Sequence, residues 1–336
     1  MNEQPTMKAA LLEAYGAPFR IATISRPSAG AGQALVRVAA SGVNPLDAKI
    51  RAGAADHAKQ KPPAVLGIYL AGVVMATGPG VTRFRSGEEV YGMTGGVGGH
   101  QGSLAEFAAV DTDLLALKPS NFSMWEASVL PLVFITAWEG IVDRMAVRAG
   151  QTVLVLGGAG GVGQMAIQIA RARGAEVFAT GSASSQETIE RLGARFIDRS
   201  EAVDAFVKRL TGGRGFDRVY DTVGGAALDG AFAAVRRFGH AVSALGWGVH
   251  ALAPLSFRAG TYSGVFTLLP LLTGEGRAHH GEILAEATRL AEAGRLAPSL
   301  DARRFTLDTL EEAYGLVTQG GARGKLAIDI EEGARS

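Results

Sequence analysis

No cysteine occurs among the 336 residues of the chain. This absence excludes disulfide bonds, cysteine nucleophiles, iron–sulfur clusters and every zinc site that uses a thiolate. An excess of one charge is also lacking, because 33 Lys and Arg residues face 32 Asp and Glu residues. Proteins that bind nucleic acids or membrane surfaces carry a strong basic excess, so we expect neither kind of partner.

Long hydrophobic runs are absent too. Residues 259–274 are uncharged, but a membrane span needs about 20 consecutive apolar residues, and this shorter stretch contains Pro270. The N-terminus carries acidic residues and only a short apolar run, which is not typical of a secretory signal. We therefore expect a cytoplasmic protein that does not contact membranes.

The chain does have a hydrophobic share of 47% and 46 unevenly distributed glycines. Its length suggests two domains, at about 100–200 residues each. The first third is rich in short strand patterns, and the glycine-rich stretch 95–102 within it is interpreted as a flexible surface loop. The strands are expected at residues 34–39, 70–76 and 89–92, with 104–110 as a strand or short helix. Helices at 282–293 and 310–319 and strands at 303–307 and 325–330 are expected near the C-terminus.

A different pattern begins at Ser123, which together with Glu126 has the spacing of a capping box at a helix N-terminus. From residue 150 on, strand patterns alternate with helix patterns. Such alternation is typical of βαβ units, so it predicts an α/β fold with a parallel sheet. We expect strands at 152–156, 176–180, 196–198, 216–221 and 240–245, and helices at 161–173, 186–192, 203–211 and 225–235.

Gly158, Gly160 and Gly163 have the spacing G-x-G-x-x-G directly after an apolar strand and at the start of a helix. This context is the one in which the motif binds dinucleotides, because glycines let the pyrophosphate approach the backbone and the helix N-terminus attracts its charge. The alternative is a tight strand-to-helix turn that binds no ligand. We interpret Gly158, Gly160, Gly161, Val162 and Gly163 as coenzyme-binding residues.

The end of the next strand indicates which dinucleotide is bound. Enzymes that use NAD place Asp or Glu there, on the ribose 2′-hydroxyl. This chain has no carboxylate there but has Ser182, Ser184 and Ser185, whose hydroxyls are able to donate to a 2′-phosphate. The alternative role of these serines is to cap the following helix. The missing acid favours NADP(H).

Taken together, many short segments resemble the zinc-free quinone oxidoreductases of the medium-chain dehydrogenase/reductase superfamily. Each segment is modest, but their order and spacing are specific and span nearly the whole chain. The segments are residues 7–9 (MKA), 42–47 (GVNPLD), 51–53 (RAG), 70–74 (LAGVV), 78–81 (GPGV), 87–92 (GEEVYG), 130–131 (LP), 136–138 (TAW), 159–163 (AGGVG), 220–225 (YDTVGG) and 324–326 (GKL).

The resemblance implies two domains in an α/β protein. The first would be a GroES-like, partly open β-barrel catalytic domain of residues 1–122 and 268–336. The second would be a Rossmann domain, a doubly wound parallel sheet, of residues 123–267. The resemblance also implies an enzyme, commonly a homodimer, that transfers hydride from NADPH to a quinone. The alternatives are a reductase of activated C=C bonds in enones, enoyl thioesters or alkenals, and a non-catalytic NADPH-binding protein.

The resemblance also suggests roles for single residues. It places Asn44 near nicotinamide and substrate, Thr136 near the nicotinamide ring, and Leu245, Phe266 and Lys325 at the coenzyme. Phe266 as plain core is the alternative for that residue.

Three further positions have competing interpretations. For Asp47 and Arg51 the alternative to a catalytic role is a structural pair that ties down a loop. Tyr69 stands where many relatives have an acid, and it faces either the site or the core.

Two departures from the family pattern matter. The tyrosine that some relatives carry shortly after the Arg-x-Gly segment is missing here, so the resemblance assigns no proton donor. Relatives also carry a lysine near Ser185, whereas this chain has Arg199, which we expect to bind the 2′-phosphate and stack on the adenine unless it is simply solvated. Zinc is not expected, because neither the Cys nor the Gly-His-Glu segment of zinc-dependent relatives is present.

Overall fold

The computed structural model describes residues 5–331. These residues form two compact units, one of residues 5–132 and 268–331 and the other of residues 133–267. Residues 123–132, which the sequence analysis assigned to the second domain, belong to the first unit, because the helix at Met124–Ala127 packs against strands of that unit.

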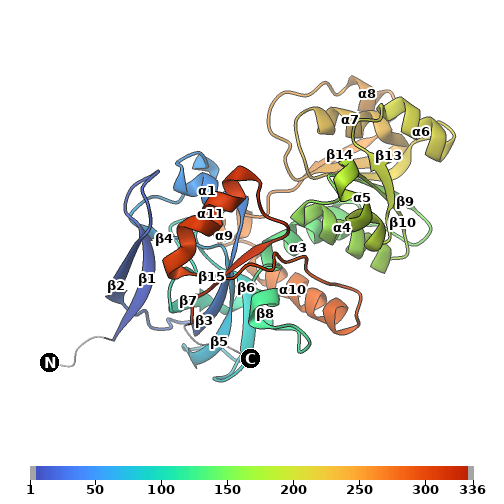
Figure 1. Ribbon diagram of the computed structural model, residues 1–336. Coiled ribbons are helices and arrows are strands. Elements are labelled where there is room, and N and C mark those ends of the chain that lie inside the picture. Colours follow the sequence, from blue (N-terminus) through green and yellow to red (C-terminus); the bar gives the residue numbers. More distant parts are fainter. Residues whose placement is uncertain (1–4, 332–336) are drawn as a thin grey trace. The chain divides into compact units, whose positions relative to one another are not determined.

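The first unit is built on two sheets of mainly antiparallel strands (Figure 1). The three-stranded sheet has the order β2-β1-β4, and the seven-stranded sheet has the order β15-β16-β3-β5-β6-β8, with β7 also paired to β3. The strands are β1 (Thr6–Leu12), β2 (Arg20–Ser25), β3 (Gln33–Val43), β4 (Ala64–Val65), β5 (Tyr69–Thr77), β6 (Glu89–Met93), β7 (Phe107–Asp111), β8 (Leu115–Leu117), β15 (Phe305–Thr306) and β16 (Leu326–Asp329).

The N-terminal and C-terminal parts of this unit pack against each other, since α11 from the C-terminal part contacts α1 and β3 of the N-terminal part (Figure 1). The helices are α1 (Pro45–Arg51), α2 (Met124–Ala127), α9 (Leu269–Thr273), α10 (Arg277–Glu292) and α11 (Leu310–Gln319), with 3-10 turns at Asp56–Ala58, Thr112–Leu114 and Leu307–Thr309. The predicted capping box before α2 is confirmed, because Ser123 Oγ accepts a hydrogen bond from Glu126 N while the Glu126 carboxylate accepts from Ser123 N.

The second unit contains one parallel sheet of six strands in the order β11-β10-β9-β12-β13-β14. Numbered from β9, this is the order 3-2-1-4-5-6 of the Rossmann fold, so the predicted doubly wound parallel sheet is confirmed. The strands are β9 (Thr152–Leu156), β10 (Glu176–Gly181), β11 (Arg195–Asp198), β12 (Phe216–Asp221), β13 (Val235–Ser243) and β14 (Thr261–Gly264).

Helices cover this sheet, with α4 on β9 and β10, α5 on β10 and β11, and α7 on β12 and β13. A core of apolar side chains that includes Leu154, Phe178, Phe216 and Phe232 is buried beneath them. The helices are α3 (Pro131–Trp138), which begins just before the unit boundary, a π-helix (Glu139–Arg144), α4 (Gly161–Ala172), a 3-10 turn (Ala183–Ser185), α5 (Gln186–Arg191), α6 (Val203–Thr211), α7 (Ala226–Ala234) and α8 (Ala253–Ser256).

The glycine-rich stretch 95–102 is not the surface loop that the sequence analysis expected. Residues 95–97 and 102 are buried. Gly98 N donates to the carbonyl oxygen of Ala58 in a 3-10 turn, and Gly102 N donates to that of Val65 in β4. Glycine is needed there for close approach rather than for freedom, because a Cβ atom on Gly102 would overlap the backbone of Leu66.

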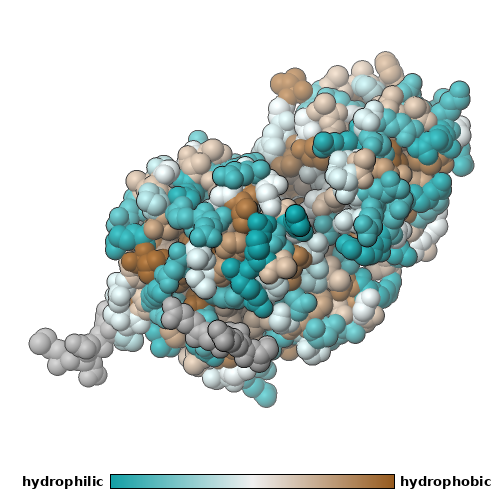
Figure 2. All heavy atoms as spheres, in the orientation of Figure 1, coloured by the Kyte–Doolittle hydropathy of each residue, from teal (hydrophilic) through white to brown (hydrophobic). Residues whose placement is uncertain are grey.

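Across residues 5–331, no helix combines the length and the apolar character that crossing a bilayer requires. On the face shown in Figure 2, hydrophobic residues lie in small patches among hydrophilic ones.

Candidate functional site

Close backbone contacts shape the turn between β9 and α4, residues 157–163, here called the glycine loop. Gly157 has a φ of +82°, in the left-handed region that favours glycine. A Cβ atom on Gly158 would stand 2.6 Å from the Cβ of Ala179, and one on Gly163 would overlap the carbonyl oxygen of Gly157. Packing within the chain therefore requires glycine at the first and last positions of the G-x-G-x-x-G motif.

Gly160 differs, because packing within the chain leaves room for a side chain there. Its φ is −70°, which any residue adopts, and a Cβ atom would stand 3.4 Å from the carbonyl oxygen of Gly157. As the N-cap of α4, Gly160 also offers no side chain to the N–H groups of Gly161, Val162 and Gly163. The first N–H groups of a helix have no partner within it and attract anions. The missing side chain at position 160 thus leaves space at an anion-binding helix end.

The carboxyl end of β10 lies against the glycine loop and carries a group of hydroxyls. Thr180 accepts hydrogen bonds from the first two N–H groups of the loop, at its Oγ1 (3.1 Å) and at its carbonyl oxygen (2.8 Å). Ser182 Oγ lies 3.0 Å from Ser184 Oγ and 3.2 Å from Ser185 Oγ. The structure therefore brings the three predicted serines together, and we call them the serine cluster.

Arg199 follows the neighbouring strand at the same edge of the sheet. β11 ends at Asp198, which pairs with Gly181 at the end of β10, and Arg199 N donates to the Gly181 carbonyl oxygen at 2.8 Å. The Arg199 side chain is exposed. Because the carboxyl ends of adjacent parallel strands meet at one edge, the serine cluster and Arg199 border the same surface.

A buried aspartate that the sequence analysis did not single out organises the next strand ends. Asp221 Oδ1 accepts from the N–H groups of Val223 and Gly224, both at 3.0 Å, and Oδ2 accepts from Ser243 Oγ at 2.7 Å. Ser243 Oγ in turn accepts from Leu245 N at 3.0 Å. Asp221 thus fixes the backbone at the predicted coenzyme residue Leu245. Its position as the last residue of a buried strand was the signal available in the sequence.

Thr136 belongs to a buried polar group in the second unit. Its Oγ1 lies 2.9 Å from Thr267 Oγ1, which also lies 2.6 Å from Glu139 Oε2. Its carbonyl oxygen accepts from Tyr220 Oη at 2.6 Å. The hydroxyl of Thr136 is thus bonded to Thr267 and its backbone carbonyl to Tyr220, so two segments distant in sequence hold this residue.

Phe266 is half-buried, so it is not the plain core residue that was weighed as an alternative. Its ring meets that of Trp247 edge to face, with ring centroids 6.1 Å apart. Leu245, which comes shortly before Trp247, is also half-buried. Both predicted residues are thus accessible in part at the carboxyl end of the sheet.

The first unit holds a second polar group, made of Asn44, Asp47, Tyr69 and Lys325 and here called the Tyr69 cluster. Asn44 Oδ1 accepts from Leu46 N at 2.9 Å, which fixes the amide so that Nδ2 donates to Tyr69 Oη at 2.7 Å. Lys325 Nζ donates to the same Tyr69 oxygen at 3.0 Å and to the carbonyl oxygen of Val43, the last residue of β3, at 3.1 Å. Lys325, predicted at the coenzyme, is therefore bonded to Tyr69.

Asp47 is fully buried in this cluster. Its Oδ2 accepts from Asn44 N at 2.9 Å and completes the capping box of α1, whereas Oδ1 has no hydrogen-bond partner among the residues that the structure describes. Burial raises the pKa of the Asp47 carboxyl to about 7, although the positive charge of Lys325 opposes the shift. Desolvation lowers the pKa of the Lys325 ammonium to about 8, and burial raises the pKa of the Tyr69 hydroxyl well above its ordinary value.

Asp47 and Arg51 do not form the structural pair that was weighed against a catalytic role. Arg51 instead bonds the carbonyl oxygen of Ala17 at 3.1 Å and the Glu311 carboxylate at 2.7 Å. Each of the two residues holds a different part of the first unit.

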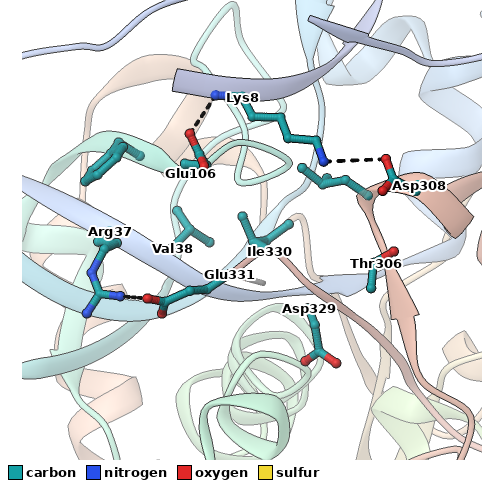
Figure 3. A pocket seen from close by; sticks show the side chains of 11 residues that line it. Lys8, Arg37, Val38, Glu106, Thr306, Asp308, Asp329, Ile330 and Glu331 are labelled. Carbon is teal, nitrogen blue, oxygen red and sulfur yellow. Dashed lines mark hydrogen bonds and ion pairs between the residues drawn. The ribbon is translucent and has the colours of Figure 1, made fainter. Parts of the chain in front are cut away.

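One pocket of the first unit, about 280 Å³ in volume, lies among charged side chains that pair with one another (Figure 3). The Lys8 ammonium lies 3.5 Å from the Asp308 carboxylate, and the backbone N–H of Lys8 donates to the Glu106 carboxylate at 2.6 Å. Arg37 forms an ion pair with Glu331. None of the predicted site residues lines this pocket, and both of its cations, Lys8 and Arg37, already pair with carboxylates of the lining, so we do not assign a function to it.

Residues 5–331 contain no group of three His, Asp or Glu side chains arranged to hold a metal ion.

Two known families match parts of the chain. The family described as Alcohol dehydrogenase GroES-like domain matches residues 30–120, and the family described as Zinc-binding dehydrogenase matches residues 192–328. The first match confirms the GroES-like domain that the sequence analysis expected.

Single proteins match over most of the chain. It is 33% identical over 313 residues to the 2-methylene-furan-3-one reductase of Solanum lycopersicum, covering 91% of this chain and 74% of that enzyme. It is 33% identical over 305 residues to a chloroplastic NADPH-dependent alkenal/one oxidoreductase of Arabidopsis thaliana, covering 88% and 72%.

Solved structures also match over nearly the whole chain. An alcohol dehydrogenase superfamily protein from Novosphingobium aromaticivorans is 57% identical with a TM-score of 0.96, over 97% of this chain and 100% of that one. The quinone oxidoreductase from Coxiella burnetii is 26% identical with a TM-score of 0.81, over 97% and 100%.

Proposed function

The chain belongs to the medium-chain dehydrogenase/reductase superfamily as a quinone-oxidoreductase-like enzyme, and from that premise we propose that it reduces conjugated carbonyl compounds with NADPH. The observation that carries this proposal is the glycine loop, in which Gly160 leaves space at the N-terminus of α4 although packing within the chain does not require glycine there. A site kept open in this way fits the pyrophosphate of a dinucleotide.

NADPH fits the residues around the loop. Its pyrophosphate would be held by the N–H groups of Gly161, Val162 and Gly163, and its 2′-phosphate by the serine cluster and the Arg199 guanidinium. The serine cluster supports the phosphorylated coenzyme, because its hydroxyls stand where an acid would repel the 2′-phosphate. The bound coenzyme supplies the hydride of the reaction.

The other predicted residues would orient the two reactants. Open α/β sheets bind their ligands beyond the carboxyl ends of the strands. We therefore place Leu245, Phe266 and Thr136 at the nicotinamide. Asn44 and Tyr69 of the first unit would contact the acceptor. Holding two reactants in a productive geometry is by itself a large catalytic effect.

Alkenals and enones are the acceptors we favour, because the two curated relatives are named as a furanone reductase and an alkenal/one oxidoreductase. Such acceptors take hydride readily, since the negative charge spreads onto the carbonyl oxygen. This property suits a chain without the cysteine and histidine ligands of a catalytic zinc. Quinones share the property, and the similarity to the quinone oxidoreductase from Coxiella burnetii supports them as a second class.

We also propose that the protein is a homodimer joined at the free edge of the second unit's sheet. β14 is the last strand of that sheet, and an exposed strand edge offers unpaired backbone groups to another strand. Two large apolar side chains close to it in sequence or on its partner strand are exposed, Phe257 at 84% and Phe238 of β13 at 75%. Their segments are adjacent, because Phe238 N donates to the carbonyl oxygen of Arg258 at 2.8 Å.

The test is coenzyme oxidation measured with a panel of 2-alkenals, enones and quinones, with NADPH and NADH compared, together with a binding titration of each coenzyme. We expect turnover with NADPH preferred. Gly160→Ala is the test variant for the glycine loop, because packing within the chain leaves room for the added methyl group, whereas a pyrophosphate bound at the helix end would meet it. Tight NADPH binding without turnover of any acceptor would identify a non-catalytic NADPH-binding protein, and equal use of NADH would contradict the role of the serine cluster.

A further inference from the structure

Reduction of a conjugated C=C bond needs a proton as well as a hydride. Hydride addition to the β-carbon moves an electron pair toward the carbonyl oxygen, and the resulting enolate must be protonated at its α-carbon. The inference below rests on the proposed function and concerns the source of this proton.

The geometry points to Tyr69 as the proton donor to the reduced acceptor, with Lys325 and Asn44 as the residues that hold its hydroxyl group. The Tyr69 oxygen receives two hydrogen bonds, from Asn44 Nδ2 at 2.7 Å and from Lys325 Nζ at 3.0 Å. Its own hydrogen has no acceptor among residues 5–331. Two other buried tyrosines differ, since Tyr91 donates to the carbonyl oxygen of Leu284 and Tyr220 to that of Thr136, at 2.7 and 2.6 Å.

The three residues stand at one edge of the seven-stranded sheet. Asn44 follows the last residue of β3, Tyr69 is the first residue of β5, and Lys325 precedes β16. Because β3 is antiparallel to both β5 and β16, these three strand ends meet at the same edge. Tyr69 is 0% exposed, whereas Asn44 is 8% exposed and Lys325 is half-buried, so the hydroxyl is covered by two side chains that are themselves partly exposed.

The ring of Tyr69 is held firmly in this position. A Cβ atom on Gly42 would stand 3.0 Å from Tyr69 Cδ2, and the Tyr69 carbonyl oxygen accepts a hydrogen bond from Ser103. The Lys325 ammonium lies 4.7 Å from the centroid of the tyrosine ring. A donor fixed by packing and hydrogen bonds needs little reorganisation when the proton moves.

In the proposed step the O–H bond of Tyr69 breaks and a C–H bond forms at the α-carbon of the enolate. The phenolate left behind is stabilised by the Lys325 ammonium and the Asn44 amide, and it regains its proton from water after product release. Burial raises the pKa of Tyr69, which keeps the hydroxyl protonated over the working pH range. A hydroquinone anion is far less basic than an enolate and takes its proton from water, so quinone reduction depends less on this donor.

Tyr69→Phe tests the assignment, and Tyr91→Phe is the matched control because it removes another buried tyrosine hydroxyl from the same unit. With NADPH, we expect Tyr69→Phe to lower kcat on an enone by about 100-fold or more, the effect of losing a general acid. The loss on a quinone should be much smaller, and Tyr91→Phe should show no such difference. Equal losses on both acceptors, or enone turnover at the wild-type rate, would overturn the assignment.

A second readout needs no coenzyme and no turnover. The acetylation rate of Lys325, followed by mass spectrometry over a pH series, reports when its ammonium loses the proton. Two groups face that ammonium, the Asp47 carboxyl and the Tyr69 hydroxyl. Removing the Tyr69 oxygen takes away an acceptor, so the acetylation midpoint should move to lower pH in Tyr69→Phe but not in Tyr91→Phe. An unchanged midpoint would refute the contact.

Lys325 is a positioning residue in this scheme. Lys325→Met should lower enone kcat, and Lys325→Arg should restore part of it because a guanidinium also donates to the phenolate. Failure of this rescue, with both variants equally impaired, would contradict the role. Lack of wild-type turnover on any enone would instead refute the proposed function itself, so the two failures are distinguishable.

Discussion

The Asp47 carboxyl offers a prediction that follows from burial alone. It is 0% exposed, one oxygen caps α1, and the other has no partner among residues 5–331. Asp47→Asn is the perturbation, because asparagine keeps a carbonyl oxygen for the N–H of Asn44 and carries no charge. The two proteins then differ mainly in whether a buried group ionises.

The magnitude follows from the pKa of this carboxyl, which burial raises from 3.8 to about 7. Between these values the folded protein keeps the proton while the unfolded chain loses it, so the free energy of unfolding falls as pH rises. One pKa unit corresponds to 1.36 kcal/mol, which gives a loss of up to about 4 kcal/mol between pH 4 and pH 7. Asp47→Asn lacks this term and should gain stability relative to wild type over the same window.

Above that window the Lys325 ammonium adds an opposite trend. Desolvation lowers its pKa from 10.5 to about 8, so the unfolded chain binds more protons above pH 8 and stability rises with pH. The pair should therefore give wild type a minimum of stability between pH 7 and pH 8. Asp47→Asn removes the acidic side of this minimum.

Urea unfolding at pH 5, 6, 7 and 8 checks the prediction. Asp56→Asn is the control, because it removes an exposed carboxylate of the same unit. The difference in unfolding free energy between Asp47→Asn and wild type should increase with pH by several kcal/mol. The control should show no comparable trend. A difference that stays constant from pH 5 to pH 8 would mean that the folded protein does not hold a proton on Asp47, and the reasoning would fail.

Three further predictions concern the second unit. Gly163→Ala should cost about 1–3 kcal/mol in urea unfolding because its methyl group would overlap the carbonyl oxygen of Gly157, whereas Gly160→Ala should unfold like wild type yet lose NADPH binding in a titration. Arg199→Ala should weaken binding of NADPH much more than of NADH, and equal losses, or none, would contradict its place at the 2′-phosphate. Phe257→Glu should turn the proposed dimer into a folded monomer in analytical ultracentrifugation, and an unchanged mass would exclude the β14 edge as the interface.

The second unit could largely be predicted from its sequence, because its elements are local. The strands at Thr152–Leu156 and Phe216–Asp221 and the helix at Val203–Thr211 have the predicted bounds. Each of them is bounded by glycine or by a short polar turn and has a clear apolar period, so no distant contact is needed to define it. β14 is one element that was not predicted: Thr261–Gly264 is a short edge strand that pairs with β13 only.

The first unit was harder to predict for a physical reason. The sequence analysis missed β1, β2 and β4 because partners in an antiparallel sheet are chosen by long-range register, as in the pairing of Leu11 with both Arg20 and Val65. The buried stretch 95–102 was misjudged for a related reason. A glycine that permits close backbone approach and a glycine that permits flexibility look alike in a sequence.

The same contrast explains how the coenzyme residues of the second unit differ from the Tyr69 cluster of the first. The glycine loop, the serine cluster and Arg199 lie in or next to the consecutive elements β9, α4, β10 and β11, so a spacing motif is sufficient to find them. The Tyr69 cluster comes from positions 44, 47, 69 and 325, which meet only because β16 pairs with β3 from Leu326 opposite Val43. Because three of these residues share one hydroxyl oxygen, their substitutions should not be additive. Lys325→Met in a Tyr69→Phe background should then cost little further enone turnover, since the oxygen that Lys325 serves is already gone.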